Sequence, residues 1–176
     1  MDTYSALLIL NQTQNIVPGQ RFRIEQYLDE LHKHNIHSQI SPHFYPQEAK
    51  TVYAHGKIPQ KNLLYLKMIH RRFADYKALK RNQHDVLFVY RESLYGPSIY
   101  FEKKYNHTSV PMIFDFDDAI WFNDTSDANK KLSFLKKPQK TASIIALSDL
   151  VIAGNEYLAD YAKQYNKNTI IIPTTI

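Results

Sequence analysis

The hydrophobic positions of the chain form short apolar runs separated by longer amphipathic segments. Ser5–Leu10 and Met112–Phe116 are apolar at nearly every position, which is typical of strands covered on both faces. Between such runs, apolar residues recur at helical spacing, as Ile24, Leu28 and Leu31 do. Strands that alternate with helices indicate an α/β fold, with a Rossmann-like, doubly wound, mainly parallel sheet and helices on both faces.

The pattern predicts a series of elements without an internal repeat or a second domain boundary. The expected strands are Ser5–Leu10, Ile36–Ile40, Asp85–Tyr90, Met112–Phe116, Leu150–Ala153 and Thr169–Ile172. The expected helices are Gln20–His34, Gln47–Ala54, Gln60–Asn82, Ser98–Tyr105, Lys130–Leu147 (with a break near Pro138) and the residues after Asn155. Polar loops are expected at Asn11–Gly19 and Ala119–Asp127, and the rest of Pro42–Pro59 is expected to be irregular. The 176 residues suit a single domain, 1–176.

The longest helical pattern, Gln60–Asn82, contains neither glycine nor proline. Its apolar stripe is expected to face the sheet and to leave the basic residues outside. The stripe consists of Leu63, Leu66, Ile69 or His70, Phe73, Tyr76 and Leu79. Because a basic surface attracts anionic lipid, peripheral contact of residues 60–82 with an anionic membrane is one interpretation, and a solvated helix face is the other.

The amino-acid composition excludes several kinds of chemical site and partner. The absence of cysteine excludes disulfides, thiolate metal sites and cysteine nucleophiles. The formal net charge is +5, but no nucleic-acid-binding motif accompanies the basic residues, so no nucleic-acid partner is expected. The eight histidines form no His-Glu-x-x-His pair, and no metal site or cofactor is expected. No signal peptide is evident at Met1, and a cytoplasmic location is expected, with peripheral association at the inner membrane face.

In doubly wound sheets, ligands bind outside the carboxyl ends of the strands. Four segments follow predicted strands and should share this edge: Asn11–Arg23, Arg91–Tyr95, Asp115–Asp124 and Gly154–Tyr157. The first of them contains Gly19, Gln20, Arg21 and Arg23. These residues suit phosphate or another anion, although a plain strand–helix turn with solvated arginines is the alternative. Arg91 can hold a carboxylate or phosphate through two hydrogen bonds, or pair with Glu92 or Asp115.

Three carboxylates lie at the end of the fourth predicted strand: Asp115, Asp117 and Asp118. A carboxylate whose pKa is raised by a neighbouring negative charge can accept a proton from a hydroxyl. The segment also fits a haloacid-dehalogenase-like phosphatase, with Asp115 as nucleophile and Asp117 as acid, or a divalent-metal Asp-x-Asp site. A further alternative is an acidic loop paired with Arg91 or Arg23.

The most distinctive segment is Asp149–Ile176. A short strand ends in the turn Ala153-Gly154-Asn155, where Asn155 can cap the next helix, and a second strand exits through Ile172-Pro173. This segment resembles the end of the N-terminal domain of group 1 glycosyltransferases, which are retaining, nucleotide-sugar-dependent enzymes of the GT-B type. The acidic segment resembles the acceptor side of the cleft in a subset of that family. The match at the first turn is weaker, because only Gly19 stands where the family often has two glycines.

The resemblance implies that the chain is the acceptor-side half of a GT-B fold and lacks the donor-binding second domain. The implied reaction transfers a sugar from a nucleotide diphosphate donor to a glycan or lipid-linked acceptor, in cell-envelope glycan or glycolipid synthesis, without metal or cofactor. The chain alone is then expected to be inactive. The implied catalytic residues are Asp117 and Asp118, and the implied acceptor- or phosphate-binding residues are Gly19, Gln20, Arg21, Arg23, Arg91, Asp115 and Asn155. A stand-alone flavodoxin-like binding module is the alternative from another class.

Overall fold

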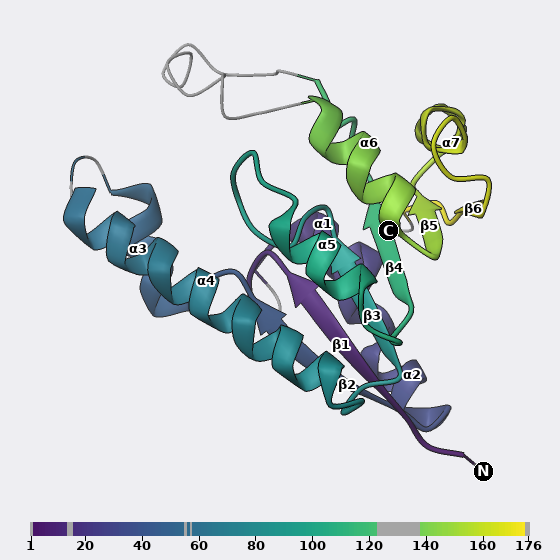
Figure 1. The fold of residues 1–176 in the computed structure, drawn as a ribbon, viewed down its shortest axis with the longest axis horizontal. Helices are drawn as coiled ribbons and strands as arrows, with labels where there is room; N and C mark the ends of the chain where they lie inside the picture. Colours follow the sequence, from purple (N-terminus) through teal and green to yellow (C-terminus); the bar gives the residue numbers. More distant parts are fainter. Residues whose placement is uncertain (1, 14–15, 55, 57, 123–137, 175–176) are drawn as a thin grey trace.

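The computed structural model describes residues 2–13, 16–54, 56, 58–122 and 138–174. These residues form a six-stranded sheet in the order β2-β1-β3-β4-β5-β6, with every neighbouring pair parallel (Figure 1). The strands are β1 (Tyr4–Leu10), β2 (Ile36–Pro42), β3 (Val86–Tyr90), β4 (Met112–Phe116), β5 (Leu150–Ala153) and β6 (Thr169–Ile171). The helices are α1 (Pro18–Arg23), the 3-10 helix η1 (Glu25–Tyr27), α2 (Leu28–Lys33), α3 (Pro46–Tyr53), α4 (Ile58–Lys80), α5 (Tyr100–Asn106), α6 (Pro138–Leu147) and α7 (Glu156–Lys163).

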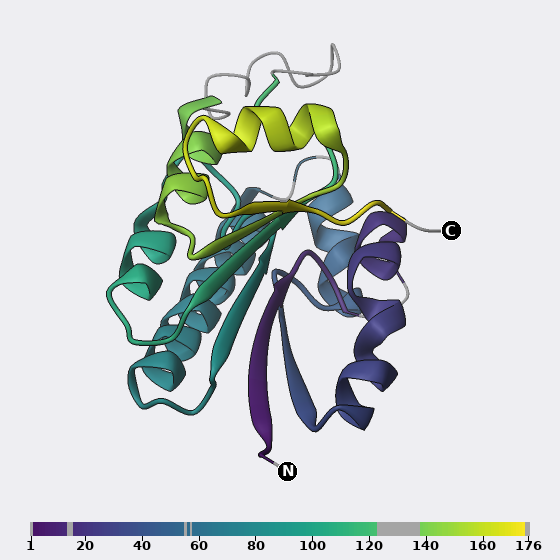
Figure 2. The same ribbon diagram turned by 90° about the vertical axis from the view of Figure 1, so that its right-hand side faces the viewer.

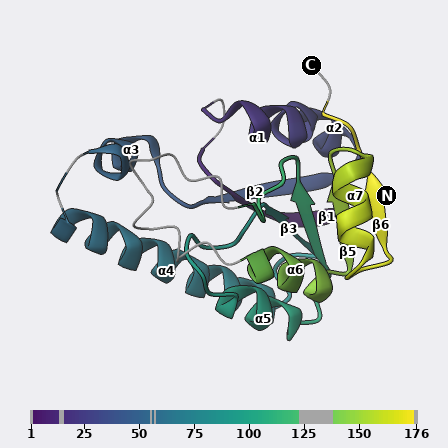
Figure 3. The same ribbon diagram turned by 90° about the horizontal axis from the view of Figure 1, so that it is seen from above.

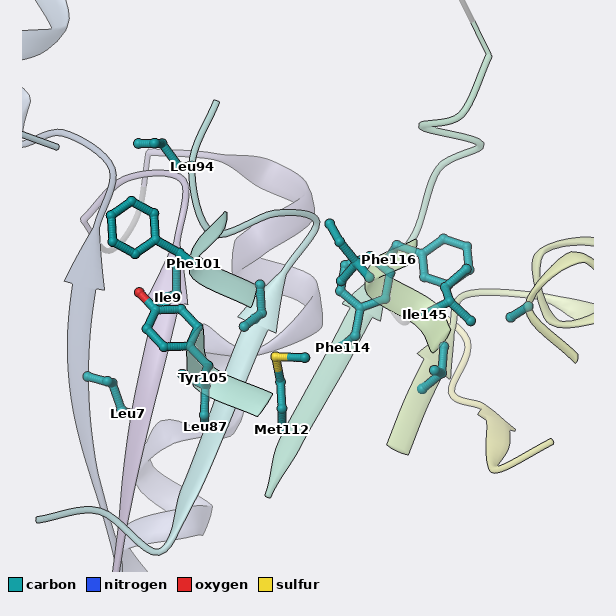
Figure 4. Close-up of a cluster of buried hydrophobic side chains, with 14 of the residues drawn as sticks. Leu7, Ile9, Leu87, Leu94, Phe101, Tyr105, Met112, Phe114, Phe116 and Ile145 are labelled. Atoms are coloured by element: carbon teal, nitrogen blue, oxygen red, sulfur yellow. The ribbon is translucent and has the colours of Figure 1, made fainter. Parts of the chain in front are cut away.

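The sheet separates two hydrophobic cores. In β1, Leu7 and Ile9 belong to the larger core, whereas Ala6, Leu8 and Leu10 belong to the smaller one, because successive side chains of a strand point to opposite faces. The larger core contains buried residues of α4, α5, α6 and α7, and Figure 4 shows part of it beside the strands. Helices α4, α5 and α6 lie on one face of the sheet, and α1 and α2 cover the opposite face (Figures 2 and 3). The predicted doubly wound α/β fold with helices on both faces is therefore confirmed.

The order of the strands determines which loops lie beside one another at the edge of the sheet. The chain passes from β1 to β2 on one side and returns to β3 on the other side of β1. Between β1 and β3 the direction of winding reverses, and doubly wound sheets bind ligands outside the carboxyl ends of the strands at such a point. The loops after β1, β3, β4 and β5 all leave this carboxyl edge, as the sequence predicts.

The prediction of one helix over Gln20–His34 was wrong. The chain forms α1, η1 and α2 instead, and α1 already begins at Pro18, within the expected loop. Ile24 ends α1 with φ −141° and ψ −41°, which is outside the helical region. The break allows two consecutive side chains to be buried: Arg23 near the sheet edge and Ile24 in the smaller core.

The long helix was predicted correctly, and its buried face was predicted in part. The buried residues of α4 are Leu64, Met68, Arg72, Asp75 and Leu79. Of the expected stripe, Leu79 is buried and Ile69 and Tyr76 are partly buried against the larger core, whereas Leu63, Leu66 and Phe73 are exposed. The reason is an ion pair with Arg72 Nε 3.0 Å from Asp75 Oδ2, which places two charged side chains on the sheet side of the helix.

The remaining elements follow the sequence pattern closely. The short helix expected near Gln47–Ala54 is α3, and Pro138 begins α6, in agreement with the expected break. Asn155 caps α7, since its side-chain oxygen accepts a hydrogen bond from the N–H of Leu158 at 2.9 Å. The first part of the predicted helix Lys130–Leu147 and most of the predicted loop Ala119–Asp127 lie outside the described residues.

Candidate functional site

A network around Arg91 joins the carboxyl ends of β3 and β4. Arg91 Nε and Nη2 donate to Asp117 Oδ1 at 2.9 and 2.8 Å, and Nη2 also donates to Asp118 Oδ2. The hydroxyl of Tyr90 donates to the Asp117 carboxylate, 2.9 and 3.0 Å from its two oxygens. The Asp117 side chain is 10% exposed and that of Asp118 is 65% exposed. Asp117 is therefore held by its neighbours, whereas Asp118 faces solvent.

The backbone of Arg91 adopts a left-handed conformation, with φ +66°. This conformation costs a residue other than glycine about 1–3 kcal/mol, and such residues cluster at functional sites. Two hydrogen bonds fix it: the Arg91 N–H donates to Asp115 O at 2.8 Å, and the Glu92 N–H donates to Tyr90 O at 2.9 Å. The turn directs the Arg91 guanidinium toward the carboxylates that follow β4.

Two glycines allow the loops to approach Asp117. A Cβ atom on Gly19 would lie 2.6 Å from the hydroxyl of Tyr90 and 2.7 Å from Asp117 Oδ2. A Cβ atom on Gly154 would lie 3.1 Å from the Asp117 Cα atom. Gly19 thus has a packing role here, because any side chain at that position would press on the Tyr90–Asp117 pair.

Arg23 forms a buried ion pair with Asp115, the residue before the last position of β4. Its Nε donates to Asp115 Oδ2 at 3.1 Å, its Nη2 donates to Asp115 Oδ1, and its Nη1 donates to the carbonyl oxygen of Ile172. One guanidinium therefore connects α1, β4 and the segment that leaves β6. Both charged side chains are almost completely inaccessible to solvent.

Burial shifts the ionisation of these groups. Burial raises the pKa of Asp115 to about 6, and the nearby charge of Asp117 adds to this effect, although Arg23 opposes it. Burial alone would lower the pKa of the Arg91 guanidinium, but Tyr90, Asp117 and Asp118 together raise it, so Arg91 remains cationic. The site therefore combines a fixed cation with a carboxyl group that titrates close to neutrality.

The other predicted site residues take structural or peripheral positions. Gln20 is buried, and its side chain exchanges hydrogen bonds with the backbone of Gln12 at 3.1 and 3.0 Å, which holds the loop after β1. Arg21 is exposed and lies over the ring of Phe22, 4.8 Å from its centroid. Asn155 is the helix cap described above. Of the predicted anion-binding residues, Arg91 and Arg21 are the cations with access to solvent.

The sequence did not predict a second polar cluster, which supports the loop that begins at Arg91. Lys140 Nζ donates to Leu94 O at 2.7 Å and to Gly96 O at 2.8 Å. His43 Nε2 lies 2.9 Å from Ser93 O, and burial together with the charge of Arg72 lowers the pKa of His43 to about 3. Arg72 Nη1 also donates to Ser93 O, at 3.3 Å. The neutral His43 and the cations Lys140 and Arg72 therefore all contact the backbone of this loop. Their spacing in the sequence gives no signal, since they come from three separate elements.

Tyr90 is the second residue whose role the sequence did not indicate. A tyrosine at the end of an apolar strand is expected to be a core residue, and Tyr90 is indeed buried. Its hydroxyl nevertheless reaches Asp117, and burial is the main reason that the pKa of Tyr90 is raised. Tyr90 therefore remains a neutral donor that fixes the Asp117 carboxylate.

A hollow of about 510 Å³ lies between α6 and α7. It is lined by Trp121, Gln139, Ala142, Ser143, Ala146, Tyr161 and Tyr165. The rings of Trp121 and Tyr161 stack with centroids 3.7 Å apart and an interplanar angle of 8°. None of the predicted site residues lines this hollow.

In the part of the chain that the structure describes, no group of three or more His, Cys, Asp or Glu residues is arranged to hold a metal ion. Nor do the described residues include a helix with the length and apolar character needed to cross a membrane. Comparison with protein-family models and with curated proteins finds no match for the chain.

Proposed function

We propose that the chain is the acceptor-side domain of a GT-B glycosyltransferase, which transfers a sugar from a nucleotide diphosphate donor to a hydroxyl of a glycan or lipid-linked acceptor. The observation that carries this proposal is the position of Arg91, Asp117 and Asp118 at the carboxyl edge of the sheet, beside the reversal of winding between β1 and β3. Ligands of doubly wound sheets bind at this place. The unit formed by β5, α7 and β6, with its Asn155 cap, supports the same proposal because the family resemblance rests on it.

The proposal assigns different roles to the two acids. Asp117 accepts hydrogen bonds from Tyr90 and Arg91 and has little access to solvent, so we assign it the positioning of Arg91. Asp118 is solvent-exposed and next to the same cation, so it is the carboxylate that an acceptor hydroxyl can reach. Arg91 and Arg21 would bind an anionic group of the acceptor.

In the proposed reaction, the acceptor hydroxyl oxygen forms a bond to the anomeric carbon of the donor sugar. The bond between that carbon and the diphosphate oxygen breaks, and its electron pair leaves with the diphosphate. The hydroxyl proton passes to Asp118, a step that typically contributes about 10²–10⁴ in rate. The resemblance implies retention at the anomeric carbon and a second domain that binds the donor; we propose no metal or cofactor for the step.

The phosphatase alternative has little support in this geometry. A nucleophilic Asp115 would have to reach a phosphorus atom, but its carboxylate is buried and both of its oxygens are held by Arg23. The alternative of a flavodoxin-like binding module has a specific observation in its favour, because the strand order 2-1-3-4-5 is common to that class. The two proposals differ in whether the gene continues into a donor-binding domain.

The test is an assay of the protein encoded by the complete gene against a panel of nucleotide diphosphate sugars, with release of nucleoside diphosphate as the readout. We expect acceptor-dependent release by that protein and none by the 176-residue chain alone. Release by the isolated chain would contradict the assignment of donor binding to a second domain. The proposal places the enzyme in the cytoplasm, at the inner face of the membrane, in polysaccharide or glycolipid synthesis.

A further inference from the structure

The space of about 510 Å³ between α6 and α7, which we call the α6–α7 hollow, has one wall of small side chains and one of aromatic rings. On α6, Ala142, Ser143 and Ala146 lie on one face of the helix, because residues three or four positions apart are neighbours. The opposite wall contains Tyr161 and Tyr165. The volume of the hollow lies within the range of small-ligand sites, which is about 300–1,000 Å³.

The aromatic wall is held in place from the protein interior. The ring of Trp121 stacks on Tyr161 at a centroid distance of 3.7 Å and meets the buried ring of Phe116 edge to face at 6.0 Å. The ring of Tyr165 lies 5.4 Å from that of Tyr161, with an angle of 61° between the two planes. Trp121 is 9% exposed, whereas Tyr165 is 45% exposed. A ligand can therefore contact the ring of Tyr165 without displacing the inner rings.

The described side chains that line the α6–α7 hollow are all uncharged at neutral pH. Burial, together with the neighbouring Tyr165, raises the pKa of Tyr161 to about 12, so its hydroxyl stays neutral. Polar groups nevertheless lie among the apolar ones: Gln139 is exposed, and Ser143 Oγ donates to Gln139 O at 2.8 Å, which leaves its lone pairs available. A charged ligand would find no counter-ion in the hollow, and a purely apolar ligand would take water from these polar groups without replacing its hydrogen bonds.

The α6–α7 hollow begins close to the candidate site along the chain. Asp118 and Trp121 are three positions apart, so their Cα atoms are separated by at most about 11 Å. In the turn that joins them, the Ile120 N–H donates to Asp118 O at 2.8 Å. The Phe122 N–H donates to Ala119 O at 3.0 Å. A ligand that extends from Asp118 by a few sugar rings can therefore reach the hollow.

The direction of α6 places one end of the hollow at the edge of the sheet that carries the site. Helix α6 ends just before β5 begins, so it runs from the carboxyl edge of the sheet toward the amino edge (Figure 1). Gln139, in the first turn of α6, lies at the end of the hollow toward the site loops, and Ala146 lies at the other end. The hollow therefore leads away from the site along α6.

We propose that the α6–α7 hollow binds a neutral glycan, so that distal sugars of the acceptor occupy it while the reacting hydroxyl lies at Asp118. A sugar ring matches the chemistry of this space, because its C–H faces are apolar and its hydroxyl groups donate and accept hydrogen bonds. Tyrosine and tryptophan offer the complement, a large apolar surface with a polar end. The inference rests on the proposed function and narrows it, since it selects a glycan over an acceptor whose single sugar is attached to a lipid.

The test is a fluorescence titration of the 176-residue chain, in which Trp121 is the single tryptophan. The probes are neutral trisaccharides of glucose, mannose, galactose and N-acetylglucosamine, and octanol serves as an apolar probe. We expect at least one trisaccharide to change the emission of Trp121 in a saturable manner. The titration needs neither donor nor sugar transfer, so its failure is distinguishable from a failure of the proposed function.

Two variants alter the two walls of the hollow separately. Tyr165→Ala removes the exposed ring and should weaken trisaccharide binding about tenfold. Ala142→Leu/Ala146→Leu fills the space with residues that favour helix formation, and it should abolish the saturable change. The matched control is Tyr4→Ala, because Tyr4 is 49% exposed at the start of β1, far from α6 and α7 (Figures 1 and 2). The control should bind as the unmodified protein does, and circular dichroism should show that all variants fold.

Several results would overturn the proposal. One is the absence of a saturable change with every trisaccharide, and another is binding that neither Tyr165→Ala nor Ala142→Leu/Ala146→Leu weakens. Equal weakening by Tyr4→Ala would show that the effect does not come from the hollow. A response to octanol alone would assign the hollow to an apolar ligand. Self-association that is lost in Ala142→Leu/Ala146→Leu, without trisaccharide binding, would assign it to contact between copies of the chain.

Discussion

Arg91 and Asp117 lie across the ends of two neighbouring strands, and both Nε and Nη2 of Arg91 donate to the same oxygen, Asp117 Oδ1, at 2.9 and 2.8 Å. This pairing requires the left-handed backbone of Arg91 and the absence of a side chain at Gly19. It separates two adjacent carboxylates that the sequence does not distinguish. Asp117 is enclosed by donors, and Asp118 remains accessible.

The two carboxylates should differ sharply in their contribution to stability. Asp117→Asn removes a charge that accepts three hydrogen bonds, so we expect a loss of about 2–3 kcal/mol in the free energy of unfolding. Asp118→Asn should change it by less than about 0.5 kcal/mol, because exposed ion pairs contribute little. Urea unfolding of both variants measures the difference. Equal losses would show that Asp117 is not held as the structure indicates.

The Arg23–Asp115 pair should behave as a unit. Arg23→Met leaves a buried carboxyl group without its cation and the carbonyl of Ile172 without its donor, so we expect a loss of about 3–5 kcal/mol. The double variant Arg23→Met/Asp115→Leu should recover most of this loss, since an apolar pair has no charge to desolvate. A double variant as unstable as the sum of the single variants would contradict the ion pair.

The raised pKa of Asp115 gives a pH dependence with a defined sign. Burial raises this pKa from 3.8 to about 6, so between about pH 4 and pH 6 the folded state holds the proton more tightly than the unfolded state. The contribution of Asp115 to the free energy of unfolding therefore falls as pH rises through this window, by about 3 kcal/mol in total, and is constant above it.

The measurement for this pH dependence is urea unfolding of the protein and of Asp115→Asn from pH 4 to pH 7. Subtraction of the two curves removes the other titrating groups, including Asp117 and the cations Arg23 and Arg91 that face Asp115. A difference that increases with pH would mean that Arg23 lowers the pKa of Asp115 more than burial raises it.

Gly19→Ala should destabilise the protein although alanine favours helix formation. The added methyl group would lie within 2.7 Å of the Tyr90 hydroxyl and of Asp117 Oδ2, and such overpacking typically costs about 1–3 kcal/mol. The neighbouring variant Arg21→Ala is the control, because Arg21 is exposed and should change the free energy of unfolding by less than about 0.5 kcal/mol. Thermal unfolding of both variants measures the difference in stability. A Gly19→Ala variant more stable than the unmodified protein would contradict the close contact of position 19 with Tyr90 and Asp117.

The central strands could be predicted from the sequence because they are apolar on both faces, as Ser5–Leu10 and Met112–Phe116 are. The buried face of α4 could not be predicted in the same way, because the apolar residues of this helix form two possible stripes. The burial of Arg72 with Asp75 selects the one that contains Leu64. From the sequence alone, the charged residues Arg72 and Asp75 are expected on the solvent side of the helix, and the structure shows that they are buried as an ion pair.

For the candidate site, the sequence predicted which loops share an edge but not which side chains pair. Arg91 and Arg23 were each compatible with several carboxylates, and register decides between them: Tyr90 lies opposite Asp115 in the sheet. The turn after Tyr90 then carries Arg91 past Asp115 to Asp117, and leaves Asp115 to Arg23. Such choices depend on backbone geometry that a single sequence does not encode in its composition or periodicity.

The role proposed for Asp118 is tested by the rate of sugar transfer by Asp118→Asn, in the protein encoded by the complete gene, at saturating donor. We expect a fall of about 10²–10⁴ in kcat with the KM for the donor unchanged, because in the proposed reaction Asp118 accepts the acceptor proton and does not bind the donor. A variant that retains the unmodified rate, or an unmodified protein that transfers no sugar from any nucleotide diphosphate donor, would contradict it.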